Sequence, residues 1–223
     1  MLQLRSKETL DHGDRGWLKA RHHFVVSAAP SCPGTTTRSR PAQVSAVTLT
    51  QTWKIVTYVR QGVVTHEDSA GNIGRTVEGD IQVMSAGTGI SHLERNDSED
   101  ALKLFQIWLL PRQRGGTPRW DSRSFPKADR TGPLIVLASG NPKNAEALLI
   151  RADARVLGAT LLAGTTVTHA PARFRHTYLA PAQGVILVNG QRLAVGDGIA
   201  AIDEPELTIT AVEDAEFILV DAA

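Results

Sequence analysis

Short runs of β-branched and aliphatic residues, separated by glycine, asparagine and aspartate, follow one another through the first half of the chain. The runs fall within residues 55–60, 63–68, 79–94 and 104–109. Turn residues lie between them, at Ser69-Ala70-Gly71-Asn72 and at Gly79-Asp80. Runs of this length bounded by turn signals predict antiparallel strands joined by hairpins. We therefore expect the first half to be a β-meander.

The second half repeats this outline. Its strand-like runs are residues 159–162, 185–188, 207–210 and 217–220. Asn189-Gly190 is a strong hairpin signal, and Gly196-Asp197 repeats the earlier Gly79-Asp80 turn. Two halves of similar length and pattern predict two β-barrels that arose by duplication.

Residues 111–133 are rich in proline, arginine and glycine and are expected to connect the two barrels. The predicted domains are therefore 1–110 and 134–223. Three arginines of the connection, Arg119, Arg123 and Arg130, could bind an anion or could simply be solvated.

Residues 25–54 do not follow the strand pattern, although Leu2-Gln3-Leu4-Arg5 before them could form a short edge strand. The stretch 27–40 contains two prolines, a glycine and three consecutive threonines, with almost no apolar periodicity. Alone, it predicts a loop or a disordered insert. A structureless segment of this length is unusual inside a compact domain, which counts against the loop interpretation.

Composition narrows the class of protein. The 223 residues carry a net charge of +1 without a basic block, so neither nucleic acid nor an anionic membrane is implied as a partner. No apolar signal region opens the chain and no run reaches ~18 apolar residues, so we expect a cytoplasmic protein without a membrane span. The single cysteine, Cys32, excludes an internal disulfide framework, and we assign it no role.

His92 and Glu94 are the candidate metal ligands. They are two residues apart, so on a strand their side chains leave the same face. An imidazole and a carboxylate on one face form half of a nitrogen and oxygen metal site. A buried or surface histidine beside a solvated glutamate is the alternative interpretation. In the second half, His169 and His176 are seven residues apart with no carboxylate at ligand spacing, so we expect no metal there.

Several motifs resemble those of known proteins. Gly79-Asp80, Gly87, His92 and Asn96 resemble the second conserved motif of the cupin superfamily. The stretches 55–59, 66–72, 82–94 and 106–111, together with Gly16-Trp17-Leu18, resemble the pirin family. The resemblance covers residues 13–24 and 54 to the end. It implies an all-β fold of two tandem cupin barrels, a bicupin. It also implies Fe(II) or another divalent transition metal, with quercetin 2,3-dioxygenase activity in bacterial members and a metal-dependent regulatory role in others.

The resemblance fails where the family has its first ligand motif, H-P-H-x-D-M-E. Here Thr48 and Thr50 occupy the positions of the two histidine ligands, and Lys54 that of the glutamate. A neutral hydroxyl is a poor donor to a transition metal, so two remaining ligands should bind weakly. Lys54 would add a cation near the site and oppose a metal further.

A shift of reading frame explains this departure. Read one base earlier, codons for residues 48–54 can instead encode H-P-H-A-D-M-E, and one extra base restores the frame at Ile55. We hypothesise that residues from about 25–34 to 54 are translated out of frame. The nucleotide sequence tests this directly.

Two functions are compatible with the sequence. The first is an iron-dependent, quercetin 2,3-dioxygenase-like enzyme with His92 and Glu94 as metal ligands and Glu94 as the catalytic residue, inactive in the chain as written. The second is a metal-free pirin-like binding or regulatory protein. For the enzyme we expect a small aromatic substrate such as a flavonol, and for either function a monomer.

Overall fold

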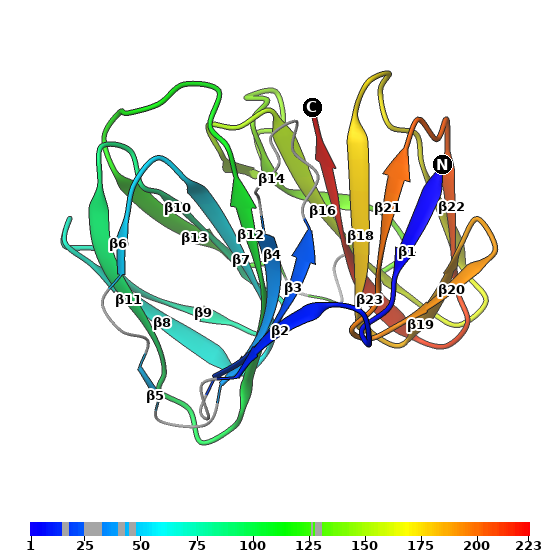
Figure 1. Cartoon of the computed structure of the whole chain (residues 1–223), viewed down its shortest axis with the longest axis horizontal. Coiled ribbons are helices and arrows are strands. Elements are labelled where there is room, and N and C mark those ends of the chain that lie inside the picture. Colours follow the sequence, from blue (N-terminus) through cyan, green and yellow to red (C-terminus); the bar gives the residue numbers. More distant parts are fainter. Residues whose placement is uncertain (15–17, 25–32, 40–42, 45–47, 126, 128–130) are drawn as a thin grey trace.

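The computed structural model describes residues 1–14, 18–24, 33–39, 43–44, 48–125, 127 and 131–223. These residues form strands and connecting turns, and no helix is found among them. Figure 1 shows two β-barrels side by side, the first mostly blue to green and the second mostly yellow to red. The sequence-based prediction of an all-β fold with two barrels is confirmed.

The first barrel consists of two facing sheets. The larger has the strand order β13-β10-β7-β12-β4-β3-β2, and the smaller has the order β5-β11-β8-β9, with β6 also paired to β11. The strands are β2 (Asp11–Asp14), β3 (Leu18–Phe24), β4 (Pro33–Ser39), β5 (Gln43–Val44), β6 (Thr48–Thr50), β7 (Lys54–Gln61), β8 (Val63–Asp68), β9 (Ile73–Val77), β10 (Ile81–Ser85), β11 (Ile90–Asn96), β12 (Leu102–Leu109) and β13 (Arg119–Arg123).

The second barrel has the same plan, with sheets ordered β1-β21-β18-β23-β16-β14-β15 and β17-β22-β19-β20. Its strands are β1 (Leu2–Arg5), β14 (Ile135–Ser139), β15 (Leu148–Leu149), β16 (Ala154–Leu161), β17 (Thr166–His169), β18 (His176–Gln183), β19 (Val185–Val188), β20 (Gln191–Ala194), β21 (Gly198–Ile202), β22 (Leu207–Ala211) and β23 (Ala215–Ala222). The edge strand expected at residues 2–5 is confirmed. It pairs with β21, so the start of the chain joins the second barrel (Figure 1).

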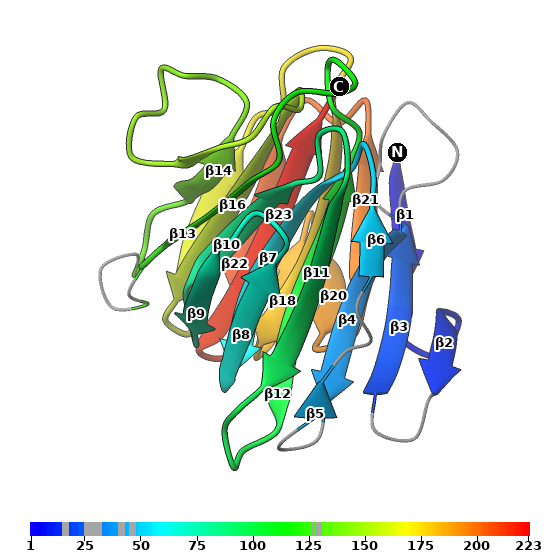
Figure 2. The ribbon, with the colours of Figure 1, turned by 90° about the vertical axis from the view of Figure 1, so that its left-hand side faces the viewer.

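Strand alternation separates two environments on β7. Val56 and Tyr58 face a large apolar cluster that includes Ile150 and Ile218 of the second barrel. Ile55, the residue before Val56, points to the opposite face, which is the inside of the first barrel. Each large side chain buried in this way contributes roughly 1.5–3 kcal/mol. The two barrels are therefore held together by the outer face of the larger sheet of the first barrel, and Figure 2 shows β7, β10 and β12 in front of the second barrel's strands.

The interiors of the two barrels differ in character. The second is filled by a cluster of aliphatic side chains that includes Leu157, Ile186 and Leu219. Among the described residues of the first, the interior apolar clusters are small and lie around Ile55 and Val59. The rest of its interior is lined by polar side chains, so the first barrel is the one that contains a candidate site.

The predicted turns are also present. Asn189 and Gly190, with φ of 46° and 82°, join β19 to β20 as a two-residue hairpin of the kind that requires positive φ at both positions. Residues 69–72 join β8 to β9, and Gly79 and Gly196 have positive φ just before β10 and β21.

Two sequence-based predictions need correction. Residues 33–39, predicted as part of a loop, form β4, which pairs with both β3 and β12. Three threonines suit a strand because their β-branched side chains fit a pleated surface, but the pairing that fixes them is non-local. Within the expected connection 111–133, residues 119–123 form β13 at the edge of the first barrel. Residues 25–32, including Cys32, and also Trp17 and Arg130, lie outside the described residues.

No helix in the described part of the chain is long and apolar enough to cross a membrane.

Candidate functional site

His92 and Glu94 lie on β11 and share one face of the strand, as their spacing predicts. On the neighbouring strand β8, Asp68 is directly opposite His92, and His66 is directly opposite Glu94. Residues that are directly opposite in an antiparallel pair have neighbouring side chains on the same face. Two histidines and two carboxylates therefore occupy one face of the smaller sheet.

The same register places the two threonines. On the other side of β11, Thr48 is opposite His92 and Thr50 is opposite Ile90. Ile90 packs against Ile55 and Met84 in the interior, so this face is the inside of the barrel. The Thr50 hydroxyl is buried, and no described residue hydrogen-bonds to it.

Glu94 is held between the amides of two glutamines. Gln82 on β10 donates to Glu94 Oε1 at 2.6 Å, and Gln106 on β12 donates to Oε2 at 3.1 Å. Burial raises the pKa of the Glu94 carboxyl to about 7, while these two hydrogen bonds act in the opposite direction. At neutral pH this group is therefore poised between its neutral and charged forms.

The orientation of each glutamine is fixed by a further donor. The Thr76 hydroxyl donates to Gln82 Oε1 at 2.9 Å, and the Trp108 indole donates to Gln106 Oε1 at 3.0 Å. Each amide must therefore direct its NH₂ group at Glu94. The carboxylate is satisfied on both oxygens by a network that needs no metal.

His66 is a site residue that spacing analysis did not single out. Its imidazole is fully buried and stacks on Trp120, with ring centroids 5.2 Å apart, and on His92, with centroids 5.9 Å apart. His66 Nε2 lies 3.1 Å from Asp68 Oδ2. Burial lowers the pKa of His66, against the opposing effect of Asp68. The spacing His66-x-Asp68 is the same two-residue spacing as His92-x-Glu94 and could have signalled it.

Gly74 makes room for this stack. It lies opposite His66 on β9, and a Cβ there would be 2.1 Å from the Trp120 ring. That distance is far inside contact range, so only glycine lets Trp120 lie flat on His66 (interplanar angle 7°). The wall of the site depends on this one small residue.

The described residues do not fit a metal site. No group of three or more His, Cys, Asp or Glu side chains in this part of the chain could hold a metal ion. Stable transition-metal sites in proteins need at least three protein ligands. His92 and Glu94 lie on one face of β11, but Thr48 is the residue opposite His92 and Thr50 the residue opposite Ile90.

The expectation that Lys54 adds a cation to the site is wrong. Lys54 is on the same face of β7 as Val56 and Tyr58, because strand neighbours alternate, and that face packs against the second barrel. Its ammonium group is buried, and no described residue hydrogen-bonds to it. Burial lowers its pKa, and repulsion from Arg151 of the second barrel lowers it further.

The histidines of the second barrel do not form a comparable site. His169 lies 3.3 Å from Asp221, a buried carboxylate that also pairs with Arg155 and Arg175. Burial would raise the pKa of Asp221, but the hydrogen bonds from these three side chains outweigh it and hold the pKa well below its ordinary range. His176 is the first residue of β18.

For the arginines of the connection, anion binding and plain solvation were both open, and of the two that the structure describes, Arg119 and Arg123, each has its own local partner. Arg119 pairs with Asp121 at 2.7 Å. Arg123 donates to the backbone carbonyls of Ala145 and Glu146. Each of the two arginines therefore stabilises its own part of the chain.

Two tandem β-barrels, one filled with aliphatic side chains and one with a polar interior that carries His92 and Glu94, define a bicupin. Models of known protein families match each of the two barrels. Residues 4–109 match the model described as Pirin, and residues 136–222 match the model described as quercetinase C-terminal cupin domain. The chain belongs to the pirin family.

Its relatives match along the whole chain. It is 46% identical over 240 residues to a pirin-like protein of Caulobacter vibrioides, with all of both chains covered. It is 45% identical over 245 residues to a putative quercetin 2,3-dioxygenase of Pseudomonas aeruginosa, again with full coverage. A solved structure of the bacterial pirin YhhW from Escherichia coli, in complex with nickel(II), superposes with a TM-score of 0.89 at 29% identity, covering 100% of this chain and 99% of that one.

Proposed function

We propose that this chain is a pirin-type, quercetin 2,3-dioxygenase-like bicupin whose metal binding, and with it any dioxygenase activity, is impaired in the sequence as written. One observation carries the proposal. The backbone register pairs Thr48 with His92 and Thr50 with Ile90, and the resemblance to the family assigns its two histidine ligands to these two threonine positions. Half of the expected ligand set is thus replaced by hydroxyls, which are poor donors to transition metals.

The metal of the intact set is proposed to be Fe(II) or another divalent transition metal. Imidazole and carboxylate ligands select weakly among such ions. The nickel(II) complex of the related E. coli pirin supports a divalent ion in this family without fixing its identity. In this chain the two ligands that remain are His92 and Glu94.

The substrate of the intact enzyme is proposed to be a small aromatic molecule of the flavonol type. The support is the name of the relatives, which include a quercetin 2,3-dioxygenase of E. coli K12, 31% identical over 231 residues. The partly buried aromatic wall formed by Trp120 on His66, together with Trp108, suits a flat aromatic ligand.

A second candidate function is a metal-free binding or regulatory protein. It is favoured by the network around Glu94, in which Gln82 and Gln106 satisfy both carboxylate oxygens without a metal. A buried carboxylate that is satisfied in this way leaves the barrel stable as a scaffold without an ion.

Turnover of quercetin separates the two. The chain as written and the double variant Thr48→His/Thr50→His are each supplied with Fe(II) under air, and the flavonol absorbance is followed. We expect no loss of the band with the chain as written and loss with the double variant. Leu49→His is the matched control, because Leu49 lies on the same strand and is exposed.

Turnover by the chain as written would contradict the impairment. Activity in the Leu49→His control equal to that of the double variant would show that added histidine, and not its position, is responsible. If neither the chain nor the double variant consumes quercetin although the double variant binds iron, the binding-protein function is favoured.

A further inference from the structure

Two β-bulges, one from each barrel, face each other between the barrels. On β7 the pairing with β12 passes from Val59↔Leu104 to Gln61↔Lys103, so Arg60 has no partner on β12. On β18 the pairing with β23 passes from Pro181 to Gln183, so Ala182 is the extra residue there. Bulges free backbone groups from the ladder and redirect side chains, and they are frequent beside functional sites.

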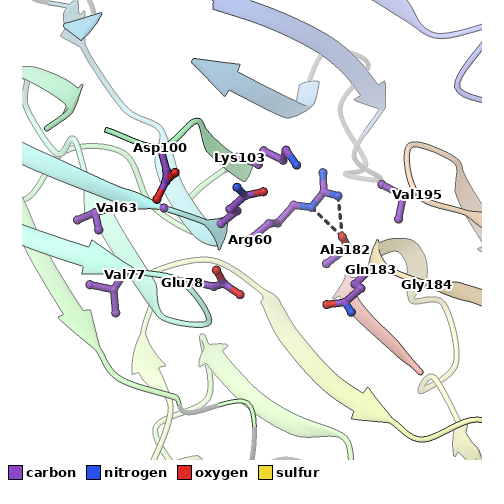
Figure 3. Close-up of a pocket in the computed structure, with 12 residues that line it drawn as sticks. Arg60, Val63, Val77, Glu78, Asp100, Lys103, Ala182, Gln183, Gly184 and Val195 are labelled. Atoms are coloured by element: carbon purple, nitrogen blue, oxygen red, sulfur yellow. Dashed lines mark hydrogen bonds between the residues drawn. The ribbon is translucent and has the colours of Figure 1, made fainter. Parts of the chain in front are cut away.

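The two bulged residues are hydrogen-bonded to each other. Arg60 Nε and Nη2 donate to the carbonyl oxygen of Ala182 at 3.2 Å and 2.6 Å (Figure 3). The Arg60 guanidinium also lies over the Phe105 ring, 4.8 Å from its centroid. One edge of the guanidinium fork is therefore fixed, which leaves the Nη1 amino group at its other end for a further acceptor.

A cleft of about 780 Å³ opens at this contact. Its size is within the range of small-molecule sites. Figure 3 shows Arg60 and Lys103 extending from the first barrel into the cleft, with Gln183 and Val195 on the side of the second barrel. The lining residues are Arg60, Gln61, Gly62, Val63, Val77, Glu78, Asp100, Lys103, Ala182, Gln183, Gly184 and Val195.

Some charged side chains of the cleft have an ion-pair partner among the described residues, and others have none. Glu78 is paired with Lys127 at 2.8 Å. Within the described ranges, neither Arg60 nor Lys103 has an ion pair with a carboxylate. Arg60 is partly buried with only a carbonyl and an aromatic ring as partners, and burial lowers its pKa to about 10. A partly buried cation without a counter-charge is costly, and an incoming anion would offset that cost.

We propose that this inter-barrel cleft binds a small organic acid, whose carboxylate is held between Arg60 Nη1 and the Lys103 ammonium and whose apolar body lies against Val195, beside the tip of Arg60 (Figure 3). A guanidinium end and a carboxylate match each other in geometry. The carboxylates of Glu78 and Asp100 line the same cleft and disfavour a more highly charged phosphate. This site is separate from the polar interior of the first barrel and does not rest on the proposed function.

Isothermal titration calorimetry with sodium benzoate tests the proposal, with inorganic phosphate as the second arm and sodium chloride at equal ionic strength as the reference. We expect saturable, one-to-one binding of benzoate and weaker binding of phosphate. Lys103→Gln is expected to weaken benzoate binding about tenfold, because one charge-assisted contact is lost. Lys143→Gln, the same substitution at an exposed lysine outside the cleft, should leave the affinity unchanged.

A second variant, Arg60→Lys, keeps the charge but loses the fork and should also weaken benzoate binding. Urea unfolding of each variant confirms that it is folded. The proposal is overturned if benzoate gives no saturable heat, if phosphate binds more tightly than benzoate, or if Lys103→Gln binds benzoate as tightly as Lys143→Gln.

Discussion

Replacing Glu94 by glutamine isolates the cost of burying a carboxylate that has no metal beside it. Because burial raises the pKa of Glu94 from its ordinary value of 4.5 to about 7, the folded protein holds a proton that the unfolded chain has released between these two pH values. Stability therefore falls as pH rises through this window, and the loss is complete above pH 7. Glu94→Gln removes this loss.

The size of the effect follows from the same two values. Each pKa unit corresponds to about 1.4 kcal/mol, so the interval from 4.5 to about 7 amounts to roughly 3 kcal/mol. Glutamine also disturbs the hydrogen bonds, because it offers an NH₂ group where both Gln82 and Gln106 already donate. That second effect does not depend on pH, so the change in the stability difference between pH 4 and pH 8 reports the ionisation alone.

The assay is urea denaturation of metal-free parent and variant across that pH range. We expect the free energy of unfolding of Glu94→Gln, relative to the parent, to rise by roughly 3 kcal/mol from pH 4 to pH 8. Glu99→Gln, at an exposed position, should show no such rise. A stability difference that is the same at all pH values would refute the reasoning.

Three further substitutions test other parts of the structure. Gly74→Ala should cost about 1–3 kcal/mol and change the Trp120 fluorescence, because its methyl group meets the indole ring; an unchanged emission spectrum would speak against the stack. Asp221→Asn should cost about 2 kcal/mol at pH 7, since the half-buried Arg155 and Arg175 lose the buried carboxylate that they share and Arg175 keeps only Asp153. This cost should vanish as pH falls through the lowered pKa of the parent carboxyl, and a cost that persists in acid would contradict the ion-pair origin. Lys54→Glu should raise the free energy of unfolding by on the order of 1 kcal/mol, because a carboxylate there attracts Arg151 where the ammonium is repelled; destabilisation in urea would argue against it.

Local patterns predict much of this fold. The two-residue spacing of His92 and Glu94 places them on one face because strand side chains alternate, and Asn189-Gly190 specifies its hairpin through positive φ. These features depend only on neighbours in the chain. They could therefore be found without knowing which strands pair.

Features that depend on distant partners could not be found in this way. The threonine run 35–37 became a strand because it is paired on both sides. Lys54 was expected near the site, but which face of β7 is inside is decided by the second barrel. His66 carried a usable signal in its spacing to Asp68, yet its contact with Trp120 joins β8 to β13 across the barrel. Arg60 and Ala182 meet only because bulges in two barrels coincide.

We propose that the first barrel keeps two metal ligands, His92 and Glu94, and has threonines at the other two positions of the family's four-ligand set. Titration with Ni(II), followed by elemental analysis of the dialysed protein, tests it most directly in the chain as written and in Thr48→His/Thr50→His. We expect far less than one metal ion per chain in the chain as written and close to one in Thr48→His/Thr50→His. One tightly held ion in the chain as written would contradict it.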